Sequence, residues 1–195
     1  MANLFSINSV GESVVRFLRD TYPEPLRTDH PCEFRQVSSA ELADAEDMET
    51  AVTLYLYRVA VDEHSRNLAP ARQPQHRPMP LSLALYFIII VWADDALAEQ
   101  TLTAWVMSQL NQHPILDRSN LSQAGGWARE DVVHFLPFEL STEDVMRIWD
   151  AVTPSYRLSL PYVARVVRID PDEAEAGLPV VATRHRYGGI DDEIA

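Results

Sequence analysis

Residues 52–61 read VTLYLYRVAV, and this stretch limits the possible folds more than any other. Only Thr53 and Arg58 in it are neither aliphatic, aromatic nor alanine. Successive side chains of a strand point to opposite faces, so both faces of this strand are apolar. A strand of that kind is covered on both sides. Residues 81–93, LSLALYFIIIVWA, form a second such segment, and the two predict an antiparallel hairpin joined by a long projecting loop.

Three helices and further short strands complete the expected pattern. Apolar residues at helical spacing predict helices over 6–22, over about 95–112 after the capping residues Asp94 and Asp95, and over 141–152 after Ser141. Strands are expected at 32–37, 131–137 and 156–170, the last one broken at Pro161 or set by it at a sheet edge. The acidic segment 38–49 is interpreted as a solvated connection, and 119–127 as a loop.

These elements predict an α+β fold: a mixed, largely antiparallel sheet of four or five strands packed by about three helices. We expect one domain over residues 1–170, followed by a flexible C-terminal tail over 171–195. Three helices suffice to cover one face of such a sheet. The other face then needs a cover, from curling of the sheet or from a neighbouring subunit, and the neighbour is the favoured interpretation.

Charge and cysteine content narrow the functional classes. The formal net charge of −13 repels phosphate backbones, so neither nucleic acid nor an anionic membrane is expected as a partner. Cys32 is the only cysteine, which excludes an internal disulfide and a multi-thiolate metal site. The N-terminus has no secretory pattern, and the apolar run 81–93 is too short to cross a bilayer. We expect a cytoplasmic protein.

The sequence contains no recognisable catalytic or cofactor-binding motif. Phosphate-binding glycine loops, HExxH and GxSxG are absent, and the six histidines are scattered singly. His30 and Cys32 flank Pro31, but neighbouring loop residues rarely form a nucleophile pair. We therefore expect no enzyme, no cofactor and no metal. Among the aromatic residues, Trp127 follows Gly125 and Gly126 in a loop and is the one that looks free to make a contact.

Several blocks in a fixed order carry a resemblance to a known family. These are VTLYLYRV (52–59), PLSLALYFIIIVWA (80–93), AEQTLTAWVMSQLNQHPIL (98–116), LSTEDVMRIWDAV (140–152) and YRLSLPYVARVVRID (156–170). Together they resemble the N-terminal part of the tube-cap protein of extracellular contractile injection systems, which are phage-tail-like particles of the virulence-cassette and antifeeding-prophage type. The resemblance covers roughly residues 5–170 and implies a fold like that of phage tail terminators.

The resemblance also implies a mechanical function. Six protomers would close into a ring on the last ring of the inner tube, stop its growth and anchor the end of the contractile sheath. The partners would be further copies of the chain, the inner tube protein, the sheath protein and, where the ring is mixed, a second cap paralogue. The protein would assemble in the cytoplasm into a particle able to leave the cell.

The residues that we expect at protein interfaces are mostly basic. The 62–80 connection concentrates positive charge, which suits acidic tube or sheath surfaces. The segment VVATRHRY (180–187) of the tail is a candidate for adding a strand to a neighbouring subunit or to the sheath. The predicted interface residues are His64, Arg66, Arg72, His76, Arg77, Trp127, Arg184 and Arg186.

Two alternatives stay open. The chain could be a small-molecule or nucleotide-binding regulatory domain, with its pocket between the helix over 95–112 and the sheet. It could also be an enzyme that uses His134 or the His30–Cys32 pair.

Overall fold

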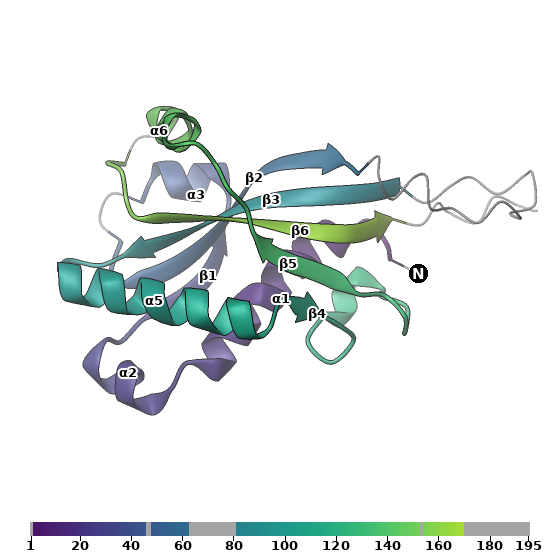
Figure 1. The fold of residues 1–195 in the computed structure, drawn as a ribbon, viewed down its shortest axis with the longest axis horizontal. Coiled ribbons are helices and arrows are strands. Elements are labelled where there is room, and N and C mark those ends of the chain that lie inside the picture. Colours follow the sequence, from purple (N-terminus) through teal and green to yellow (C-terminus); the bar gives the residue numbers. More distant parts are fainter. Residues whose placement is uncertain (1, 46–47, 63–80, 153, 170–195) are drawn as a thin grey trace, which may run out of the picture.

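The protein folds around one curled sheet (Figure 1). A computed structural model describes residues 2–45, 48–62, 81–152 and 154–169. Its sheet has six strands in the order β1-β2-β3-β6-β5-β4. Their bounds are β1 Glu33–Val37, β2 Ala51–Val61, β3 Leu81–Trp92, β4 Ile115–Leu116, β5 Val133–Pro137 and β6 Ser159–Ile169. The predicted α+β class with a mixed, largely antiparallel sheet is confirmed, but the expected number of strands is too small because β4 has only two residues.

The two apolar segments pair as predicted. β2 and β3 run antiparallel, with Ala51 opposite Trp92 and Val61 opposite Leu83. β1 lies parallel to β2 but pairs only with its first half, from Glu33–Ala51 to Val37–Tyr55. The other strand pairs are antiparallel. The hairpin is therefore the centre of the fold, and the first half of β2 is an inner strand while its second half lies at the sheet edge.

Pro161 does not break β6 or set it at an edge, contrary to our expectation. β6 is continuous and lies between β3 and β5. The carbonyl oxygen of Pro161 accepts a hydrogen bond from the Phe138 N–H, just beyond the end of β5. The nitrogen of a strand residue points to the same side as its carbonyl. The missing N–H of Pro161 therefore faces that side and removes no bond from the pairing with β3.

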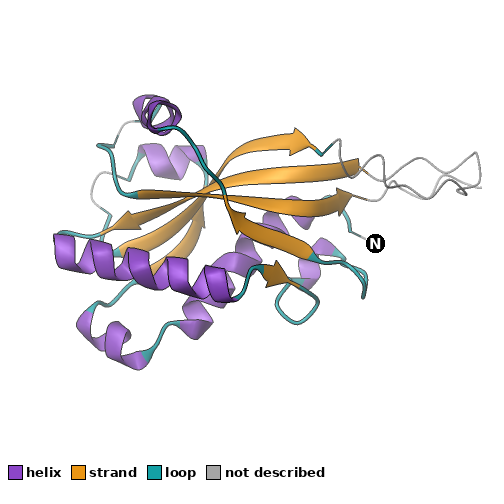
Figure 2. Ribbon diagram, viewed as in Figure 1, coloured by secondary structure: helices purple, strands orange, loops and turns teal. Residues whose placement is uncertain are grey.

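One face of the sheet is covered by two long helices (Figure 2). These are α1 (Ser6–Thr21) and α5 (Ala96–Gln112), both close to their predicted bounds. The inner stripe of α5 consists of the buried residues Ala98, Leu102, Val106 and Leu110, and the last three belong to the main core. Phe87 and Phe135 contribute to the same core from the sheet. A short helix, α2 (Glu24–Asp29), follows α1 and was not predicted.

The opposite face carries two further helices at one end of the sheet. They are α3 (Ser39–Ala43) and α6 (Thr142–Asp150). Trp149 of α6 is buried there, with its ring 6.3 Å from that of Trp92. This arrangement corrects two expectations: the predicted helices do not all lie on one face, and the 38–49 segment contains a helix whose Leu42 is buried. No helix within the described ranges is long and apolar enough to cross a membrane.

Candidate interface surfaces

Most of the predicted interface residues lie outside the residues that the structure describes. His64, Arg66, Arg72, His76 and Arg77 fall within 63–80, and Arg184 and Arg186 fall within 170–195. The expected domain boundary at 170 and the tail lie outside as well. Only Trp127 can be placed, so the interface has to be sought on the described surface.

The Trp127 side chain is held by the fold. It is half-buried and packs against the main core, and its indole Nε1–H donates a 2.8 Å hydrogen bond to Ser9 Oγ of α1. Ser9 Oγ in turn donates to the Ser122 carbonyl oxygen at 3.0 Å. The indole lies so close to Gly125 that a Cβ there would come within 2.3 Å of Nε1. Trp127 therefore locks its own loop onto α1, and a contact with a partner remains a prediction for its exposed part.

Buried serines on α1 explain how this loop is held. Ser6, Ser9 and Ser13 have no exposed surface, and the Ser122 N–H donates a hydrogen bond to Ser13 Oγ. Ser9 and Ser13 bond the loop through their hydroxyls, whereas the Ser6 hydroxyl is buried without a partner among the described residues. Buried serines on the inner face of an amphipathic helix indicate that a polar loop packs there, since most buried hydroxyls have partners. The serines at positions 6, 9 and 13 are therefore the feature of the sequence from which packing of the 119–127 loop on α1 could have been predicted.

The half of the second sheet face that α3 and α6 leave uncovered carries a group of arginines. Arg58 lies over the Tyr86 ring, 5.0 Å from its centroid. Arg165 pairs with His134 of β5, and Arg168 pairs with Ser82 of β3. We call Arg58, Arg165 and Arg168, with His134 beside them, the arginine face.

Two properties of the arginine face point to an interface. All three arginines are exposed, and no described carboxylate forms an ion pair with them. Between them the floor consists of small side chains, Ala60, Ala84 and Ser82, and the Ser82 hydroxyl is buried without a hydrogen-bond partner. Unpaired positive charge around a shallow apolar floor is typical of a surface that a partner covers.

The free edge of β2 adds exposed apolar side chains on the face of the sheet opposite the arginine face. Because β1 ends opposite Tyr55, residues 56–61 of β2 have no neighbour on that side among the described strands. Val59 and Val61 are 46% and 54% exposed on this edge, and Leu81 is 45% exposed on β3. Open apolar edges are sites of strand addition or of contact with another chain.

A groove of about 710 Å³ lies beneath α6, on the same sheet face as the arginine face. Its walls come from α3, from α6 and from Tyr55, Tyr57 and Arg58 of β2. Burial raises the pKa of the Tyr57 hydroxyl, which therefore stays protonated at physiological pH. Between α5 and the sheet, where the sequence placed a possible pocket, Leu102, Val106 and Leu110 of α5 are buried in the main core. On the described surface, this groove is a candidate place for a small-molecule function.

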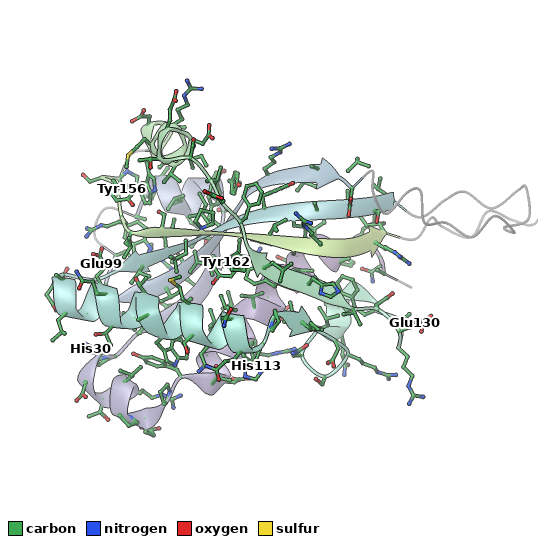
Figure 3. The ribbon with its side chains drawn as sticks, viewed as in Figure 1. His30, Glu99, His113, Glu130, Tyr156 and Tyr162 are labelled. Atoms are coloured by element: carbon green, nitrogen blue, oxygen red, sulfur yellow. The ribbon has the colours of Figure 1, made fainter. Side chains whose placement is uncertain are left out.

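The residues considered for catalysis do not form a site. Burial raises the pKa of the Cys32 thiol to about 12, which keeps it protonated and poorly nucleophilic at neutral pH. His30 lies at the C-terminal end of α2 (Figure 3), and Cys32 packs against the main core. No cluster of three metal-binding side chains occurs in the described part of the chain. His134 lies on the sheet beside Arg165, at the arginine face.

The curled, mostly antiparallel sheet with helices on both faces defines an α+β domain of the kind found in tube-terminating proteins of contractile particles. The chain belongs to the Pvc16 N-terminal domain family, whose model matches residues 9–183. Its fold is similar to that of a PVC sheath/tube terminator of an extracellular contractile injection system, in the extended state. The TM-score is 0.54 at 15% identity, over 99% of this chain and 65% of that one.

A second solved structure gives the same result. It is the tube-terminating cap of the anti-feeding prophage, with a TM-score of 0.53 at 14% identity, over 92% of this chain and 59% of that one. The chain thus spans less than two thirds of the length of either protein. A comparison with curated proteins gives no match. The family resemblance stated from the sequence blocks is confirmed.

Proposed function

We propose that this protein is a structural cap that terminates the inner tube of a phage-tail-like injection system and anchors the distal end of its contractile sheath. The observation that carries the proposal is the family match over residues 9–183, together with the shared fold of two tube-terminating proteins. In this function the protein acts as a hexameric ring and catalyses no reaction. Its partners are other copies of the chain, the inner tube and the sheath, with a second cap paralogue where the ring is mixed.

The described surface supports such a mechanical function. A ring needs faces that bind further chains. Among its described residues, this chain presents an apolar strand edge without a neighbouring strand, and arginines without an ion-pair partner on one sheet face. We also propose that the basic residues of the connection between β2 and β3, in the segment 62–80, contact acidic tube or sheath surfaces. The tail from 171 is proposed to add a strand to a neighbouring subunit or to the sheath.

The proposal is tested by deleting the gene in the producing strain and measuring particle lengths by negative-stain microscopy. Without a cap, we expect overlong tubes, particles without sheath, or no particles, and restoration by the intact gene. Normal particles from the deletion strain would refute the proposal. A thermal-shift assay of the purified protein against nucleotides and metabolites would then test the groove beneath α6 as a ligand site.

A further inference from the structure

We propose that adjacent copies contact each other head to tail, with the arginine face of one copy covered by the acidic outer side of α6 from the next. This inference rests on the proposed ring and names the surfaces that close it. The arginine face is half of a sheet surface whose other half is already covered by a helix, the chain's own α6. A second α6, from a neighbour, is therefore a cover of the right kind for the exposed half.

Charge complementarity favours a second copy of this chain as the partner that covers the arginine face. The chain carries a formal net charge of −13, and all sixteen of its Lys and Arg residues are arginines. At the α6 end of the molecule, Glu139, Glu143 and Asp150 are exposed. Of these three, only Glu143 has an ion-pair partner among the described residues, Arg147 of the same helix, and that pair is itself exposed to solvent. Guanidinium groups bind carboxylates in a planar, two-point geometry, which suits this pairing.

The shapes of the two surfaces also agree. Met146 of α6 is 39% exposed beside these carboxylates. The floor between the arginines is made of the small side chains Ala60, Ala84 and Ser82, against which an apolar side chain such as Met146 can pack. Arg58 is already stacked on Tyr86, so it is partly ordered before a partner binds and loses less entropy on binding.

The positions of the surfaces lead to a ring. Arg165 and Arg168 lie toward the Val61 end of β2, and α6 packs toward the Ala51 end (Figure 1). The two surfaces border each other at the groove beneath α6, where Arg58 and Glu139 both contribute to the wall. Contact between two different surfaces of identical chains is heterologous; repeated head to tail, such contacts form a ring when the rotation between copies divides a full turn, and an open helix when it does not. A symmetric dimer would have to make both arginine–carboxylate contacts at once across a single two-fold axis, and its sedimentation coefficient distinguishes it from a ring.

The test uses two charge-reversed variants of the full chain. In the first, Arg165→Glu and Arg168→Glu reverse the arginine face; in the second, Glu139→Arg and Asp150→Arg reverse the α6 side. The control, Arg118→Glu with Arg129→Glu, makes the same charge change at exposed arginines away from the arginine face. All of the changed side chains are exposed, and circular dichroism with thermal melting checks that each variant folds.

Sedimentation velocity at about 100 μM measures the assemblies. We expect wild type and control to form rings, and each reversed variant alone to lose self-association by tenfold or more. An equal mixture of the two variants should form rings again, because every contact in an alternating ring pairs opposite charges. Any of three results would overturn the inference: the wild type is monomeric, either variant alone still forms a ring, or the mixture of the two variants does not assemble. The deletion experiment above tests the cap function independently of these outcomes.

Discussion

Removing the hydroxyl of Ser9 tests whether the 119–127 loop is part of the folded body. In Ser9→Ala, the Trp127 indole N–H loses its acceptor at 2.8 Å and the Ser122 carbonyl loses its donor at 3.0 Å. A net hydrogen bond contributes about 1 kcal/mol, and a buried group left without a partner costs about 1–3 kcal/mol. Since Trp127 is only half-buried, water can replace part of the loss. We expect unfolding to become easier by about 2–3 kcal/mol, which lowers Tm by roughly 5–10 °C.

Urea unfolding, followed by tryptophan fluorescence and far-ultraviolet circular dichroism, measures this change. The matched control is Ser108→Ala on α5, whose hydroxyl accepts an exposed hydrogen bond from Gln112 and should matter by less than about 0.5 kcal/mol. A double-mutant cycle with Trp127→Phe, which keeps the apolar ring area but deletes the N–H, should give a coupling of about 1 kcal/mol. A Ser9→Ala effect as small as the control, or no coupling, would refute the view that Trp127 anchors the loop.

Three further predictions concern the body of the fold. Leu102→Ala on α5, at a side chain with no exposed surface, should cost about 2–5 kcal/mol in chemical unfolding, and a cost below about 1 kcal/mol would mean that α5 does not seal the core. Asp95→Ala removes the side-chain acceptor of the Ala98 N–H and should cost about 0.5–2 kcal/mol, with Asp95→Asn largely restoring stability. The pKa of Cys32 is raised from 9.0 to about 12 in the folded state, so between these two pH values the thiol ionises only in the unfolded chain. The free energy of unfolding should therefore fall as the pH rises above 9, and it should fall less steeply in Cys32→Ala.

The central hairpin was predictable because its physical signal is local and strong. Residues 52–61 and 81–93 are apolar on both faces, and only a covered strand satisfies that pattern. The inner stripe of α5 was predictable for the same reason, since Leu102 and Val106 recur at helical spacing. However, an amphipathic pattern predicts only that a helix buries one of its sides. It does not predict which face of the sheet that side packs against. The position of α6 on the second face therefore appeared only in three dimensions.

Short elements and distant contacts were missed for other physical reasons. Ser38 and Glu41 form a capping box that begins α3, but the many carboxylates of this segment indicated a solvated connection. β4 has two residues and carries no periodicity. The arginine face combines residues from β2 and β6, which the sequence separates by about a hundred positions and the sheet register brings together. The predicted basic loop and tail residues lie outside the described ranges and remain predictions.

The most direct test of the cap function is a cryo-electron microscopy map of the distal end of intact particles. If the protein terminates the tube, a ring with the six-stranded fold described above should lie on the last ring of the inner tube and contact the end of the sheath. An uncapped distal end, or density for this fold at the opposite end of the particle, would contradict the account.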